Sequence, residues 1–66
     1  MIFSRFFAKN VSAEQAKVLC LLAGVFVTFH ENGDVSFLGD AMGICIVHEM
    51  LRTREGCEPT EIKTVY

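Results

Sequence analysis

Apolar and polar residues alternate on either side of Asn32-Gly33, which indicates two strands joined by a tight turn. A two-residue turn at Asn32-Gly33 would mix apolar and polar side chains on both faces of this hairpin. A three-residue loop, with Gly33 left-handed in a G1 bulge, pairs Val27 with Phe37 and Thr28 with Ser36, and it separates the faces. We therefore predict the second register. One face then carries Val25, Val27, Phe29, Val35 and Phe37, and the other carries Thr28, His30, Asp34 and Ser36, with Phe26 and Leu38 at its far end.

The segment before the hairpin has the signals of a helix over residues 13 to 23. Ser12 and Gln15 have the spacing of a capping box, and Gly24 suits the left-handed residue that ends a helix. The second half of this segment, VLCLLA, is apolar on nearly every side. We expect that end of the helix to be enclosed on more than one face.

A second helix is predicted from Ala41 to about Glu55, with Asp40 as its N-cap and Gly56 as its closing residue. Its apolar arc faces one side, and the opposite side is polar. Gly43 lies inside the apolar arc, where glycine costs about 1 kcal/mol of helix propensity relative to alanine. We expect another backbone to come close at that position. The apolar arc contains Gly43, Ile44, Ile46, Val47, Met50 and Leu51, and the polar side contains Cys45, His48, Glu49, Arg52 and Glu55.

The two ends of the chain are less clearly patterned. In the apolar N-terminal segment, residues 1–11, the side chains of Ile2, Phe3, Phe6 and Phe7 would share one side of a short helical turn. The tail, residues 57–66, alternates enough to add a third strand beside the hairpin, or it is a loose end. We predict a single α+β domain over residues 1–66, with two helices packed on one face of a β-hairpin in the order α-β-β-α.

Composition adds a functional expectation to this fold. The chain has 66 residues, of which 52% are apolar and six are Phe. A domain of this length buries only about 60% of the surface that its unfolded chain exposes, so apolar surface should remain uncovered. We predict a non-enzymatic protein-interaction module that acts as a homodimer, or as an adaptor or inhibitor of a larger protein. Its expected contact residues are Phe3, Phe6, Phe7, Ile46 and Met50.

Charge argues against nucleic acid as the partner. The formal net charge is −2, and the six Lys and Arg residues are spread along the chain rather than clustered. The alternative is a small DNA-binding transcriptional regulator, in which Arg52 and Arg54 of two copies would add into one phosphate-binding surface. Membrane contact by the N-terminal segment would rest on only two cations, Arg5 and Lys9, and is not expected.

The predicted compartment is the cytoplasm. The longest apolar run, Val18 to Val27, is shorter than the roughly 20 residues that span a bilayer. The N-terminal segment lacks the continuous apolar stretch of a signal peptide. Three cysteines are an odd number that fits no internal disulfide framework, so free thiols are expected.

Four residues are candidates for metal binding. Cys45 and His48 are one helical turn apart, and Cys57 and His30 would complete a tetrahedral zinc site. Their spacing matches no familiar zinc module, and buried cysteines and surface histidines are common without any metal. We therefore predict no metal, no cofactor and no catalytic residue, since two helices and a hairpin leave little room for a cleft. His30 and Asp34 are interpreted as a cross-strand pair rather than an acid–base dyad.

Overall fold

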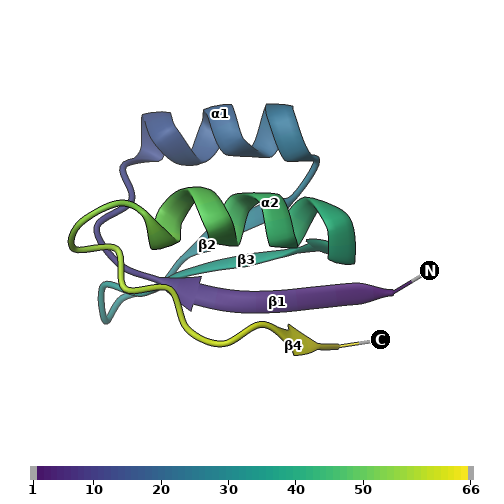
Figure 1. Ribbon diagram of the computed structural model, residues 1–66. Helices are drawn as coiled ribbons and strands as arrows, with labels where there is room; N and C mark the ends of the chain where they lie inside the picture. The colour runs from purple at the N-terminus through teal and green to yellow at the C-terminus, as the bar shows by residue number, and fades with distance from the viewer. Residues whose placement is uncertain (1, 66) are drawn as a thin grey trace.

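The computed structural model describes residues 2–65, in which two helices lie over one face of a four-stranded antiparallel sheet (Figure 1). The spatial order of the strands is β2-β3-β1-β4. The elements in chain order are β1 (Phe3–Ala8), α1 (Ala13–Ala23), β2 (Phe26–Phe29), β3 (Val35–Asp40), α2 (Ala41–Arg52) and β4 (Lys63–Thr64).

The chain follows a split β-α-β topology. Strands β1 and β2 flank α1 in the chain and run parallel, with β3 inserted between them in the sheet. Strands β3 and β4 flank α2 in the same way, with β1 between them. The α+β class, the two helices and the antiparallel sheet agree with the sequence. The predicted α-β-β-α order is the middle of a longer β-α-β-β-α-β order, because a strand precedes the first helix and another follows the second.

Helix α1 has the predicted bounds and caps. The Ser12 hydroxyl accepts a hydrogen bond from the backbone N–H of Gln15 at 3.1 Å. Gly24 is left-handed, with φ of 65°, and its N–H donates to the carbonyl of Cys20 at 2.9 Å. These local signals position the end of α1 directly before β2.

The hairpin has the predicted register, with Val27 opposite Phe37 and Thr28 opposite Ser36. The His30 N–H donates to the Asp34 carbonyl, the Gly33 N–H donates to the His30 carbonyl, and Gly33 has φ of 94°. This is the three-residue loop with a bulge at Gly33. The side chains of His30 and Asp34 do not form the expected pair, because His30 hydrogen bonds to the Ser36 hydroxyl and Asp34 to Asn32.

The N-terminal segment is a strand rather than the predicted helical turn. Strand β1 lies between β3 and β4, where Phe6 is opposite Phe37. The side chains of Ser4, Phe6 and Ala8 are buried, and the alternate positions Arg5 and Phe7 are more exposed. Pairing with β3 on one edge and β4 on the other favours a strand here, although the local spacing of the apolar residues is helical.

Helix α2 ends three residues before the predicted position. The Arg54 N–H donates to the carbonyl of Leu51, and the Thr53 hydroxyl donates to that of Met50, so a turn closes the helix after Arg52. Gly56 has φ of 88° in the following loop, and its carbonyl accepts a hydrogen bond from the Asn10 side chain. Gly56 thus has the positive φ that was predicted for a helix cap, but it lies in the loop after α2, where it contacts Asn10 just beyond β1.

The tail forms a short strand beside β1, and not beside the hairpin. In β4, Thr64 is opposite Ser4. Further along, Thr60 and Phe7 are joined twice: the Thr60 N–H donates to the Phe7 carbonyl, and the Phe7 N–H donates to the Thr60 hydroxyl. Hydrogen bonds therefore hold the tail against β1 from Ser4 to Phe7.

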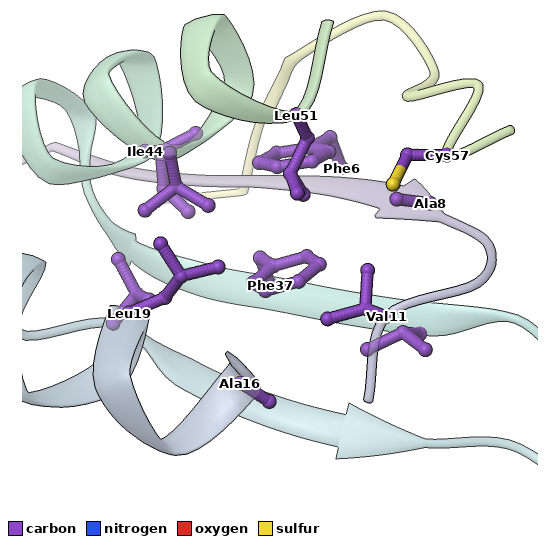
Figure 2. Packing of buried hydrophobic residues seen from close by; sticks show 12 residues of the cluster. Phe6, Ala8, Val11, Ala16, Leu19, Phe37, Ile44, Leu51 and Cys57 are labelled. Carbon is purple, nitrogen blue, oxygen red and sulfur yellow. The ribbon is translucent and has the colours of Figure 1, made fainter. Parts of the chain in front are cut away.

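The core lies between the sheet and the helices (Figure 2). The rings of Phe6 and Phe37 stack with their centroids 5.0 Å apart. A Cβ atom at Gly43 would lie 2.6 Å from the carbonyl oxygen of Ala23, which confirms that another backbone comes close there. The buried apolar residues are Phe6, Ala8, Val11, Ala16, Leu19, Val25, Val35, Phe37, Ile44, Val47, Leu51 and Cys57.

Candidate interaction surface

The two helices expose apolar side chains on the side that faces away from the sheet. Of the nine large apolar side chains that are exposed among the described residues, six lie on α1 and α2, with exposed fractions from 45% to 80%. We call these six residues the helical apolar face: Val18, Leu21 and Leu22 on α1, and Met42, Ile46 and Met50 on α2.

The spacing of these residues makes the face continuous along each helix. Met42, Ile46 and Met50 follow one another at intervals of four, so they form one stripe along α2. Val18 and Leu22 have the same interval on α1. The helices meet the core through other residues, notably Leu19 and Ile44, and are thus apolar on both the inner and the outer side.

The two stripes meet at a groove between the helices. Val18 and Leu19 line this groove from α1, Met50 lines it from α2, and Arg54 lines it from the turn after α2. A second hollow on α2 is lined by Cys45, Ile46, Glu49, Met50 and Thr53. Met50 belongs to both hollows, so the groove and the α2 stripe form one connected surface.

One ion pair lies at the rim of this surface. The Arg52 Nε–H donates to Glu49 Oε2 at 3.0 Å, and this hydrogen bond, with the charge of Arg52, lowers the pKa of the Glu49 carboxyl. The same pair raises the pKa of Arg52. Pairing with Glu49 compensates the charge that the DNA-binding alternative assigns to Arg52, which leaves less of it for a phosphate.

The five predicted contact residues do not share one surface. Ile46 and Met50 are 52% and 45% exposed and belong to the helical apolar face. Phe6 is 1% exposed, stacked on Phe37 and in edge contact with the His48 ring, so no partner can reach it. Phe3 and Phe7 alternate with the core-facing residues of β1 and belong to the sheet face away from the helices.

Sequence reasoning missed Val18, Leu21, Leu22 and Met42. The signal for the α1 residues was present, since the second half of that helix is apolar on nearly every side. Residues 2–65 do not provide the expected enclosure on more than one face, because Leu21 and Leu22 are 80% and 74% exposed. Met42 was missed because it lies just outside the predicted apolar arc of the second helix.

The open face of the sheet carries a smaller cluster around Phe7. The Arg5 guanidinium lies over the Phe7 ring, 5.6 Å from its centroid, and the His30 ring centroid is 5.7 Å from that of Phe7. A hollow beside this ring is lined by Arg5, Thr60, Glu61 and Lys63, among others. Glu61 offsets part of the positive charge at this place.

The candidate metal ligands are dispersed. His48 Nε2–H donates to the Thr60 carbonyl at 2.9 Å, on the helix side of the sheet, whereas His30 contacts Ser36 and Phe7. Cys57 is buried with its thiol toward the Asn10 carbonyl, and Cys45 is exposed on α2. Across residues 2–65 the structure gathers no group of three or more Cys, His, Asp or Glu side chains that could hold a metal ion.

Neither helix in the described part of the chain is long and apolar enough to cross a bilayer. Comparisons with protein-family models, with curated proteins and with solved structures find no match to this chain.

Proposed function

We propose that this protein is a non-enzymatic interaction module and that its helical apolar face binds an apolar surface of a larger protein, as an adaptor or inhibitor. The observation that carries this proposal is the position of six exposed large apolar side chains on one side of two packed helices. Contiguous apolar patches on small domains mark interaction sites, whereas apolar residues scattered singly do not.

The energetic scale of this face fits specific binding. Full burial of one Val, Leu, Ile or Met side chain is worth about 1.5–3 kcal/mol. The six side chains are roughly half to four-fifths exposed, so covering all of them would contribute on the order of 5–10 kcal/mol before the cost of association. Because that cost is itself about 4–15 kcal/mol, a partner must cover most of the face and add polar contacts at its rim.

The residue types suit an adaptable contact. Met42 and Met50 are unbranched and flexible at the two ends of the α2 stripe, which lets them adjust to an uneven partner surface. Glu14 and Lys17 on α1, with Glu49 on α2, supply exposed charges for a polar rim. We place this function in the cytoplasm, where the three separate thiols of Cys20, Cys45 and Cys57 would stay reduced.

The experiment compares two single substitutions that add the same charge. The partner is first identified by co-purification with the unmodified chain and is then purified, so that the dissociation constant can be measured by calorimetry. Leu22→Lys adds a cation inside the helical apolar face, and Thr64→Lys adds one at an exposed position of β4. We expect Leu22→Lys to weaken binding at least tenfold, with Thr64→Lys near the unmodified affinity. Equal affinities for the two folded variants would refute the proposal.

A further inference from the structure

Strand β2 is an edge of the sheet, and its outer side has no neighbouring strand within residues 2–65. We propose that a second copy of this chain pairs with β2 there, antiparallel and about a two-fold axis, so that two four-stranded sheets become one eight-stranded sheet. This inference concerns a different surface from the helical apolar face and names a different partner.

The hydrogen bonds of the hairpin determine which backbone groups point outward. The His30 N–H donates to the Asp34 carbonyl, so residues 30 and 34 are a hydrogen-bonded pair. In an antiparallel ladder such pairs alternate with pairs that are not hydrogen bonded. Thr28 and Ser36 therefore bond to each other, and the N–H and C=O groups of Val27 and Phe29 point away from β3, toward the free edge.

The other strands support this assignment. By the same alternation, Phe7 on β1 should direct its backbone groups away from β3 and toward the tail. Its carbonyl indeed accepts from the Thr60 N–H, and its N–H donates to the Thr60 hydroxyl. The alternation of inward and outward backbone groups is thus the same from β1 to β2. Val27 and Phe29 therefore each present one N–H donor and one C=O acceptor at the free edge of the sheet.

The composition of β2 leaves this edge unprotected. Natural edge strands commonly carry a charge, a proline or a bulge that prevents pairing with another chain. The sequence of β2, Phe-Val-Thr-Phe, has none of these and consists of residues that favour strands. Phe26 and Phe29 are 65% and 51% exposed, so the strand offers apolar surface as well as free hydrogen-bonding groups.

One register satisfies all the free groups of this strand. If Thr28 lies opposite Thr28 of the second copy, Val27 lies opposite Phe29 in both directions, and each of these pairs exchanges two hydrogen bonds. Phe26 then lies opposite His30. The cross-strand neighbours are an aromatic with a β-branched residue, two threonines, and two aromatic rings, all of which are favourable combinations. Centring the axis on Val27 instead would require the Val25 carbonyl to accept a second hydrogen bond, in addition to the one from the Cys20 thiol at 2.7 Å, and is therefore less favourable.

This symmetry determines where the helices lie. A two-fold axis through a pair of antiparallel strands of one sheet is perpendicular to the sheet, so both copies have their helices on the same side. The pairing is isologous, because β2 contacts only itself, and it therefore closes at two copies.

The test uses opposite charges at the centre of the proposed contact. Thr28 is exposed on the sheet face away from the helices, so Thr28→Lys and Thr28→Glu should each fold. In the dimer each variant places two like charges directly opposite each other, which is destabilising. We expect the unmodified chain to sediment as a dimer, each variant alone as a monomer, and an equimolar mixture of the two variants as a dimer. Thr64→Lys and Thr64→Glu on β4 are the matched controls and should each remain dimeric.

Amide hydrogen exchange provides the second measurement. The amides of Val27 and Phe29 should exchange slowly in the dimer and at least tenfold faster in Thr28→Lys, while that of Thr28, bonded inside the hairpin, should change less. A monomer at about 1 mM unmodified chain, a dimer that persists in Thr28→Lys, or a mixture that stays monomeric would each overturn the inference. Leu22→Lys should leave the dimer intact, which separates this test from that of the proposed function.

Discussion

Replacing Gly43 by alanine tests the close approach of the two helices. The added Cβ would lie 2.6 Å from the carbonyl oxygen of Ala23 and 3.5 Å from the Val25 side chain. The first contact is shorter than folded proteins tolerate, and its partner is backbone rather than a flexible side chain. Ala23 has little freedom to move, since Gly24 is bonded to Cys20 and Val25 is 1% exposed. The helices must therefore separate at this end.

Two effects of opposite sign decide the result. Alanine gains about 1 kcal/mol of helix propensity over glycine. Overpacking a close contact costs about 1–3 kcal/mol, and the upper part of that range applies here because the obstacle is a carbonyl of the neighbouring helix. We therefore expect Gly43→Ala to lower the free energy of unfolding by about 1–2 kcal/mol. For a domain of this size, that corresponds to a fall in Tm of roughly 4–16 °C.

Urea denaturation followed by circular dichroism measures this change. Met42→Ala is the control, because it introduces alanine at the preceding position, where the side chain is 73% exposed. The control should change the free energy of unfolding by less than about 0.5 kcal/mol. If Gly43→Ala were as stable as the unmodified chain or more so, the backbone contact would not constrain the helices and the packing argument would be wrong.

Three further substitutions test other parts of the structure. Phe6→Ala removes the ring stacked on Phe37 and should cost about 3–5 kcal/mol in denaturant titration, so a loss below about 1 kcal/mol would contradict its place in the core. Ser12→Ala removes the cap of α1 and should cost about 0.5–2 kcal/mol, with faster exchange of the Gln15 amide; an unchanged exchange rate would exclude the cap. Arg52→Ala should return the lowered pKa of Glu49 toward its ordinary value in an NMR titration. Because the folded-state pKa is lowered, the stabilisation by this pair is present above the ordinary carboxyl pKa and is lost as pH falls through the lowered value; an unchanged pKa would show that the pair does not form in solution.

Local sequence signals predicted the parts of the fold that depend on neighbouring residues. Helix α1 has its capping serine and its closing Gly24 within the same short segment, and the hairpin register follows from alternation around Gly33. Gly43 was also informative, because a glycine within an apolar helical arc indicates a close backbone. In each case the deciding residues lie in or directly beside the element they specify.

Strand β1 depends on partners that are remote in the chain, and the sequence did not reveal it. Its buried positions include the small residues Ser4 and Ala8, while Phe7 lies on the opposite face, so an apolar–polar alternation is not visible. The predicted position of the tail was wrong for the same reason. Strand β4 pairs with β1, which was not recognised as a strand, and not with the hairpin. The exposed apolar residues of the helices were foreseen only in part: Ile46 and Met50 were named as exposed, but the leucines Leu21 and Leu22 of α1 were expected to be covered.

The central position of β1 has a consequence for the order in which the chain can fold. This strand comes first in the chain, yet its partner residues are more than 25 positions away on β3 and about 60 away on β4. The β2–β3 hairpin can close early because its ends are neighbours, whereas β1 gains its edges only after both later strands exist. Such distant pairings slow folding relative to a helical bundle of equal length. During synthesis, the phenylalanines of β1 would thus leave the ribosome well before β3 and β4, the strands that flank them in the sheet.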